Sequence, residues 1–193
     1  MKKIKKEIRI LGVDDAPFDK KDKECLVVAT VFRGGNFLDG LLSCKVEVDG
    51  SNATKKLVKL INKSKHKQQL KIIMLDGIAL GGFNIIDIQK LNKKTKLPVI
   101  VLMRHLPNLK DVKKALKKFK DFERRFDLLK NAGKIYKMNI KNKFLYFQVA
   151  GISTKQAKEI IKLSSTRSLL PEPIRVSHLI ASGIIKGESR GRA

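Results

Sequence analysis

Three aspartates stand where a carboxylate could bind a metal ion. Asp14 ends the apolar run at 10–13, and Asp76 ends the apolar run at 72–75. Asp49 closes a third segment of the same kind. A carboxylate at the tip of a buried strand is costly to desolvate unless it is paired or binds a cation. We therefore predict that the three side chains converge at one edge of a sheet and hold a divalent metal.

Such a cluster would suit phosphodiester chemistry. In a two-metal nuclease, one ion activates water and the other stabilises the leaving oxygen. Oxygen ligands favour Mg²⁺ or Mn²⁺. Further acids lie near in the chain, namely Asp15, Asp39 and Asp87. Asp39 could serve a bend instead, Asp87 could begin a helix, and Asp49, which precedes a glycine, could belong to a turn.

The charge of the chain indicates an anionic partner. The 43 Lys and Arg residues against 18 Asp and Glu give a net charge of +25. A field of this size attracts phosphate backbones, although a general bias toward lysine would give the same composition. With two cysteines, no apolar leader and no membrane-length run, we expect a cytoplasmic protein. We expect nucleic acid as its partner, no membrane association, and a monomer.

The first half of the chain predicts an α/β fold. Alternating and apolar runs predict a meander of three strands, then strands that alternate with helices. The strands are expected at 7–13, 24–33, 37–48, 70–75 and 98–103, and the helices at 53–63 and 84–92. Three antiparallel strands followed by parallel strands, flanked by helices, match the ribonuclease H-like mixed sheet. Other α/β folds can be written in the same order.

The second half adds helices and a small extra hairpin. We predict a helix or helix pair over 112–129, a hairpin from strands 134–138 and 143–149, a helix from Ser153 or Thr154 to Leu163, and a last helix from Pro171 to Ile185. Residues 1–185 are expected to form a single domain of the ribonuclease H-like endonuclease kind. Residues 186–193 read as a mobile basic tail.

Several segments resemble a known group of nucleases. Ile10–Asp14 resembles the first strand of endonuclease V, which ends Gly-Val-Asp, and Leu75-Asp76-Gly77 resembles its Val-Asp-Gly. An archaeal family of unassigned endonuclease V-like proteins is more similar still. Its marks appear here in order as Asp14–Phe18, Val48–Thr54 and Asp76–Ile88. The resemblance covers roughly residues 7–185, and several ordered segments carry it.

The resemblance implies a ribonuclease H-like fold and Mg²⁺-dependent cleavage of a phosphodiester. Asp14 and Asp76 would be metal ligands, and Asp49 would replace a glutamate that ends the third strand of endonuclease V. Arg104 would take the place of a functional lysine. These four residues are the expected catalytic set.

The chain departs from endonuclease V where that family contacts its lesion. No tyrosine wedge precedes the third-strand acid, since the segment reads Phe37–Leu42. A loop of Gly81, Gly82, Phe83 and Asn84 replaces the residues that follow the fourth strand there. We predict that this loop and His105 bind substrate, because glycines allow close backbone approach and a phenylalanine can stack on a base. Phe83 could equally pack in the core.

Our first hypothesis is a metal-dependent endonuclease of DNA repair. It would cut DNA at or near a deaminated base, uracil or hypoxanthine, because a damaged base is easier to extrude. Two alternatives remain open. The chain could be a non-catalytic nucleic-acid-binding protein that keeps the fold, or a ribonuclease.

Overall fold

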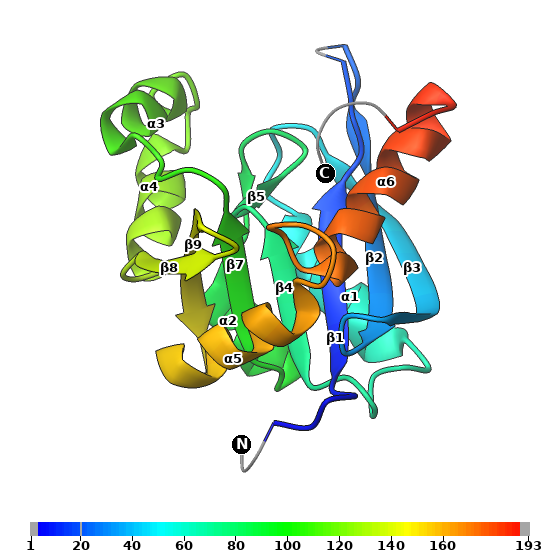
Figure 1. Ribbon diagram of the computed structural model, residues 1–193. Coiled ribbons are helices and arrows are strands. Elements are labelled where there is room, and N and C mark those ends of the chain that lie inside the picture. Colours follow the sequence, from blue (N-terminus) through cyan, green and yellow to red (C-terminus); the bar gives the residue numbers. More distant parts are fainter. Residues whose placement is uncertain (1–3, 20, 190–193) are drawn as a thin grey trace.

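A computed structural model describes residues 4–19 and 21–189. Its centre is a seven-stranded mixed sheet with the order β3-β2-β1-β4-β7-β9-β8 (Figure 1). The strands are β1 (Arg9–Asp15), β2 (Glu24–Arg33), β3 (Phe37–Glu47), β4 (Ile72–Asp76), β7 (Val99–Met103), β8 (Tyr136–Ile140) and β9 (Lys143–Ala150). The first three pair antiparallel, β4 and β7 run parallel to β1, and β9 returns antiparallel to β7. The predicted ribonuclease H-like sheet is confirmed. Its extra hairpin, β8 and β9, extends the main sheet.

Helices cover both faces of the sheet. One face packs against α1 (Ala53–Lys63) and α2 (Ile88–Thr95), and the other against α5 (Thr154–Ser164) and α6 (Glu172–Lys186). A helical hairpin of α3 (Leu109–Leu116) and α4 (Phe122–Asn131) projects beside β8 and β9 (Figure 1). A two-stranded ribbon, β5 (Ala79–Leu80) and β6 (Asn84–Ile85), follows β4. None of the helices in the described part of the chain is long and apolar enough to cross a bilayer.

The alternation of side chains along each strand decides which core it joins. Leu11 and Val13 of β1 face α1 and α2, whereas Ile10 faces α5 and α6. Because side chains alternate between faces, Gly12 and Asp14 also point toward α6. The last two acids of β1, Asp14 and Asp15, therefore point to opposite faces of the sheet.

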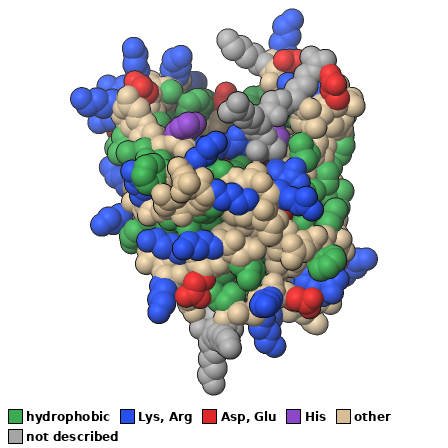
Figure 2. Space-filling model, in the orientation of Figure 1, with side chains coloured by type: hydrophobic (Ala, Val, Ile, Leu, Met, Phe, Trp, Pro, Cys, Tyr) green, Lys and Arg blue, Asp and Glu red, His purple; other side chains and the backbone are tan. Residues whose placement is uncertain are grey.

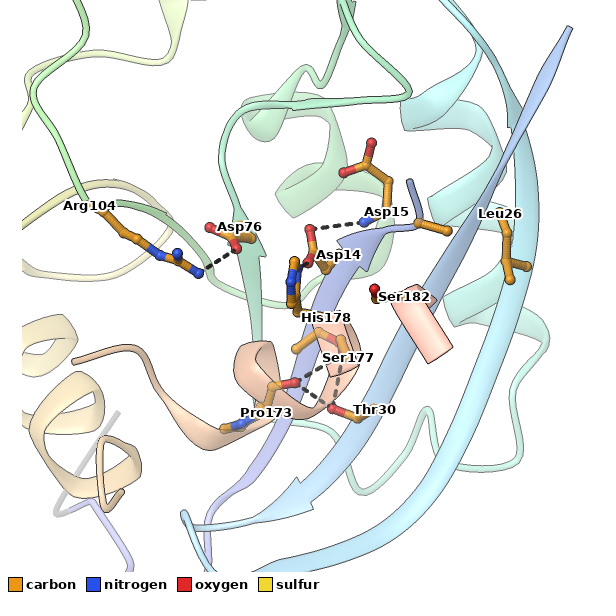
Figure 3. A network of polar contacts seen from close by, with 12 residues as sticks. Asp14, Asp15, Leu26, Thr30, Asp76, Arg104, Pro173, Ser177, His178 and Ser182 are labelled. Carbon is orange, nitrogen blue, oxygen red and sulfur yellow. Dashed lines mark hydrogen bonds and ion pairs between the residues drawn. The ribbon is translucent and has the colours of Figure 1, made fainter. Parts of the chain in front are cut away.

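A glycine in β1 lets α6 approach the sheet closely. A Cβ atom built at Gly12 would overlap the backbone carbonyl of Pro173, at the start of α6. The Ser177 hydroxyl, one turn later, donates to the Gly12 carbonyl oxygen at 2.8 Å. Thr30 of β2 donates to the Pro173 carbonyl oxygen at 2.6 Å. These buried contacts fix the position of α6 against the ends of β1 and β2 (Figure 3).

Most strand bounds differ from those expected by one or two residues, and two helical segments differ more clearly. The helix expected over 84–92 begins only at Ile88, because Asp87 is its N-cap and accepts from the Lys90 amide at 2.8 Å. The long helical segment divides at residues 117–121 into α3 and α4. The predicted mobile tail, 186–193, lies partly outside the described residues. Within them, α6 ends at Lys186 with Gly187 as a left-handed C-cap.

Candidate active site at the strand ends

Asp14 and Asp76 meet on one face of the sheet. Gly12 is the register partner of Met74 in the parallel pair of β1 and β4. Two residues further along, Asp14 and Asp76 therefore stand side by side and point to the same face. Figure 3 shows both carboxylates at the ends of their strands, next to α6. This part of the predicted site follows directly from strand register.

A histidine from α6 completes the pair. His178 Nδ1 lies 2.9 Å from Asp14 Oδ2. The contact exists because Gly12 and Ser177 place α6 directly over β1. The site residues expected from the sequence did not include His178. The structure instead brings it to the two acids.

Burial disfavours the charged forms of the two acids and so raises their pKa values. Asp14 is 5% exposed. Burial, helped by the charges of Asp76 and Asp15 and opposed by His178, raises the pKa of Asp14 to about 7. Burial likewise raises the pKa of Asp76, against the effect of Arg104. The hydrogen bond to Asp14 raises the pKa of His178. Asp14 is therefore poised to take up or release a proton near neutral pH.

Arg104 lies on the other side of Asp76. It follows the last residue of β7, the parallel neighbour of β4, and its guanidinium is 4.0 Å from Asp76 Oδ2. The side chain is 32% exposed, so it can face a solvent-borne ligand while it stays beside the acid (Figure 3). The structure thus places three of the four expected catalytic residues together.

Asp15 and Asp49 hold the glycine loop. Asp15 Oδ2 accepts from the Gly81 amide at 2.8 Å, on the face away from Asp14. Asp49 Oδ1 accepts from the Phe83 amide at 2.8 Å, and the Asp49 amide donates to the Gly81 carbonyl oxygen. These bonds support the left-handed backbone at Gly81 and Gly82. The role of Asp49 as a third metal ligand stays a prediction.

A buried arginine ties this loop to the helical hairpin. Arg125 of α4 is 7% exposed and donates to the carbonyl oxygens of Phe83 and Asp49 at 2.6 and 2.8 Å. Its guanidinium also pairs with Asp121 at 2.6 Å and lies 4.3 Å from the centre of the Phe119 ring. Not all basic residues of α3 and α4 are surface charges, because Arg125 is buried and joins the α3–α4 hairpin to the glycine loop.

The other predicted substrate contacts divide into two kinds. Asn84 is fully buried; it accepts from the Ala53 amide and donates to the Glu47 carbonyl oxygen at 2.9 Å each. The structure gives Asn84 a structural role instead of a substrate contact. His105 is exposed beyond β7, and Phe83 is half-buried with its ring 5.6 Å from that of Phe119.

An apolar cavity of about 530 Å³ lies past the ends of β4 and β7, on the face of the sheet away from Asp14 and Asp76. Phe83 and Gly82 of the glycine loop form one wall, and Met103 and Pro107 at the end of β7 form another. The inner side of α3 and α4 closes it. Two of its lining residues, Ile78 and Met103, are close in the chain to Asp76 and Arg104, but neither Asp76 nor Arg104 lines the cavity. Its size and apolar walls suit a planar aromatic group.

The described residues include no ready-made group of three or more His, Cys, Asp or Glu side chains that could hold a metal ion. The structure joins Asp14, Asp76, His178 and Arg104, while Asp15 and Asp49 support the loop. One signal could have found His178. A glycine two residues before a strand-end acid, on the same face, indicates close approach of another backbone, and the small Ser177 next to His178 suits that approach.

Comparison with known proteins places the chain in a family. The family model described as endonuclease dU matches residues 6–185. The chain belongs to the endonuclease dU family. A UPF0215 protein of Methanothermobacter thermautotrophicus is 49% identical over 194 residues, covering 100% of this chain and 95% of that protein. This bears out the resemblance to an archaeal endonuclease V-like family.

Solved structures agree with the endonuclease dU assignment. A protein from Archaeoglobus fulgidus matches with a TM-score of 0.85 and 40% identity, over 93% of this chain and 99% of that one. Ciona intestinalis endonuclease V, in complex with a DNA that contains inosine, matches with a TM-score of 0.60 and 15% identity, over 93% and 86%. The second match shows that the fold is that of endonuclease V. Family and fold together identify a nuclease.

Proposed function

We propose that this endonuclease dU protein is a metal-dependent endonuclease that hydrolyses a phosphodiester bond of DNA at or near a deaminated base, in DNA repair. The observation that carries the proposal is the Asp14–Asp76 pair. A buried and a half-buried carboxylate on neighbouring parallel strands face the same side, and an arginine and a histidine flank them. Such a site fits a phosphodiester held by its charged oxygens.

The donor set fits a divalent cation. Asp14 and Asp76 offer hard oxygen ligands, which suit Mg²⁺ or Mn²⁺. Burial raises the pKa of both acids, so their ionised forms are short of compensating charge, and a cation would supply it. We propose that both acids hold the metal, with Asp49 as the third ligand. A bound metal would polarise the scissile phosphate and make water more acidic.

The side chains of the protein would bind the phosphate, position Asp14 and receive the base. Arg104 is placed to donate hydrogen bonds to a phosphate oxygen and to stabilise the charge that develops there. His178, whose Nδ1 lies 2.9 Å from Asp14 Oδ2, would hold this carboxylate in position. The apolar cavity lined by Phe83, on the other face of the sheet, could receive an extruded base that stacks on this ring. Because this chain has no tyrosine wedge of the endonuclease V kind, its site would have room for a lesion other than inosine.

A cleavage screen tests the proposal. Labelled oligonucleotides would carry one deoxyuridine, one deoxyinosine, one abasic site or no lesion, beside an RNA of the same sequence. We expect nicking of the deoxyuridine or deoxyinosine strand in Mg²⁺ or Mn²⁺ and none in EDTA. Binding without cleavage of any oligonucleotide would favour the non-catalytic binder. Preferential cutting of the unmodified RNA would favour the ribonuclease.

The buried acids also predict a pH dependence of stability without metal. The folded-state pKa values of Asp14, Asp76 and His178 are all raised, so the native state binds more protons than the unfolded chain, and stability falls as pH rises. Since the pKa of Asp14 is about 7, we expect a loss on the order of 2 kcal/mol between pH 5 and 7. Urea unfolding in EDTA measures it. The Asp14→Asn variant should show a weaker pH dependence, and an unchanged one would contradict the assignment.

The two roles of Asp49 can be separated by paired variants. Asp49→Asn keeps a side-chain oxygen for the Phe83 amide and tolerates the φ of 54°, so we expect stability within about 0.5 kcal/mol of wild type. Asp49→Ala loses the bond and should cost about 1–2 kcal/mol. The three-ligand hypothesis further predicts that Asp49→Asn loses cleavage by about a hundredfold or more. Normal cleavage by Asp49→Asn would leave Asp49 with loop support alone.

A further inference from the structure

A second cavity, a groove of about 850 Å³, begins at Arg104 and leads away from the acids. One wall is the segment after β7, with His105 and Leu106. The opposite wall is the β8–β9 hairpin, and the loop before α6 forms the third side. Lys141, at the tip of the hairpin, donates to the Thr166 carbonyl oxygen at 2.8 Å and so joins two of these walls. The groove is continuous with the candidate active site.

The described lining of the groove is basic. Arg104, His105, Lys141, Lys143 and Arg167 come from all three walls, and no carboxylate stands among the lining residues. Lys143 and Arg167 are both exposed. Figure 2 looks onto the face with α5 and α6, where Lys and Arg side chains spread across the middle of the molecule. A groove of this kind attracts a chain of phosphates.

Two aromatic residues of β9, Phe144 and Tyr146, are also among the lining residues of this groove. Along β9, Leu145 and Phe147 are buried in the core, so Phe144 and Tyr146 point outward on the other face. The Phe144 ring is 51% exposed. The ammonium of Lys137 lies 3.5 Å from its centre, a cation–π contact that holds the ring in place and leaves part of it open to solvent.

We propose that this groove binds a single strand of nucleic acid that leaves the cleavage site, with a base stacked on Phe144 and phosphates near Lys143 and Arg167. The inference rests on the proposed function, because it names the path of the strand whose phosphate would lie at Arg104. It adds a binding site beyond the metal and the lesion.

The combination of rings and charges selects a single strand. In a duplex the bases stack on each other and offer no open face to Phe144, so only the phosphate contacts would remain. An unpaired strand presents both phosphates and bases, and stacking on an aromatic ring does not depend on sequence. An acidic peptide could use the charges, but it offers no repeating planar groups for the rings.

Binding measurements on the full chain test the proposal. The probe is a fluorescein-labelled oligo(dT) of about 20 nucleotides, titrated in EDTA so that cleavage does not interfere, beside a duplex of equal length. We expect Phe144→Ala to weaken binding of the single strand about tenfold, within the range of one base–aromatic stack, and to change duplex binding much less. The matched control is Phe37→Ala on β3, a ring that is 56% exposed and lies 5.3 Å from the guanidinium of Arg33.

Removing two positive charges from the groove tests the phosphate contacts independently of the ring. In the double variant Lys143→Gln, Arg167→Gln, the slope of log K against log salt should decrease by about 1.4, at roughly 0.7 per lost phosphate contact on a single strand. Lys93→Gln, Lys94→Gln on α2 removes the same charge from the opposite face and should change the slope far less.

The outcomes separate this inference from the proposed function. If Phe144→Ala binds oligo(dT) like Phe37→Ala while wild type still cuts lesion DNA, the groove assignment is wrong and the function stands. If Phe144 matters for binding but wild type cuts nothing, the groove stands and the nuclease proposal falls. Equal weakening of duplex and single strand, or no binding of oligo(dT) by wild type, would also overturn the single-strand path.

Discussion

The variant Asp76→Asn should lose cleavage by about a thousandfold, which corresponds to several kcal/mol of transition-state stabilisation. The substitution keeps the shape of the side chain and removes the charge that a metal and Arg104 would share. Because burial raises the pKa of Asp76, the neutral amide should not lower the stability of the metal-free fold. Oligonucleotide binding should stay within about threefold, since most phosphate contacts lie elsewhere.

Three measurements on the same preparation check this expectation: the single-turnover cleavage rate, the melting temperature in EDTA, and affinity for uncleaved oligonucleotide. Asp127→Asn is the matched control, because Asp127 is 58% exposed on α4 and pairs only at the surface with Lys130. Near-normal cleavage by Asp76→Asn would refute the metal-ligand role of Asp76. A parallel fall in melting temperature would mean that misfolding, rather than lost chemistry, explains the loss.

The second large effect is a loss of stability, which we expect for the variant Gly12→Ala. The added Cβ would overlap the backbone of Pro173, and neither β1 nor the start of α6 can move without breaking buried hydrogen bonds to Ser177 and Thr30. We expect a loss of about 3 kcal/mol or more in the free energy of unfolding. Urea denaturation at fixed pH measures it.

Gly183→Ala is the matched control on the same helix. A Cβ atom there meets nothing within 4 Å, so alanine should stabilise α6 by up to about 1 kcal/mol through helix propensity. If Gly12→Ala is as stable as wild type, the close packing of α6 on β1 is wrong. The position of His178 relative to Asp14 would then also be in doubt.

The fold could be predicted because its signals are local. Strand alternation, the Gly34-Gly35 turn and the helix caps are short-range patterns, and β2 and α1 have the bounds that the sequence predicted. The sequence left open whether 112–129 forms one helix or a pair, because both α3 and α4 present the same apolar and basic pattern.

Only the part of the site that depends on the order and register of the strands could be predicted from the sequence. Asp14, Asp76 and Arg104 end neighbouring parallel strands, so topology alone brings them together. His178 comes from a helix about a hundred residues after Asp76, and its position depends on how closely α6 packs. Asn84 was misassigned because a polar residue after two glycines looks exposed, whereas here its amide bridges α1 and the end of β3.

The contact between Asp14 and His178 has a consequence for the order of synthesis. Asp14 belongs to the first strand and His178 to the last helix, so they leave the ribosome at opposite ends of translation. A nascent chain could assemble all seven strands and still lack the helix that carries His178. The histidine that contacts Asp14 therefore arrives only with α6, and the arrangement of Asp14, Asp76 and His178 is complete only after α6 has been made.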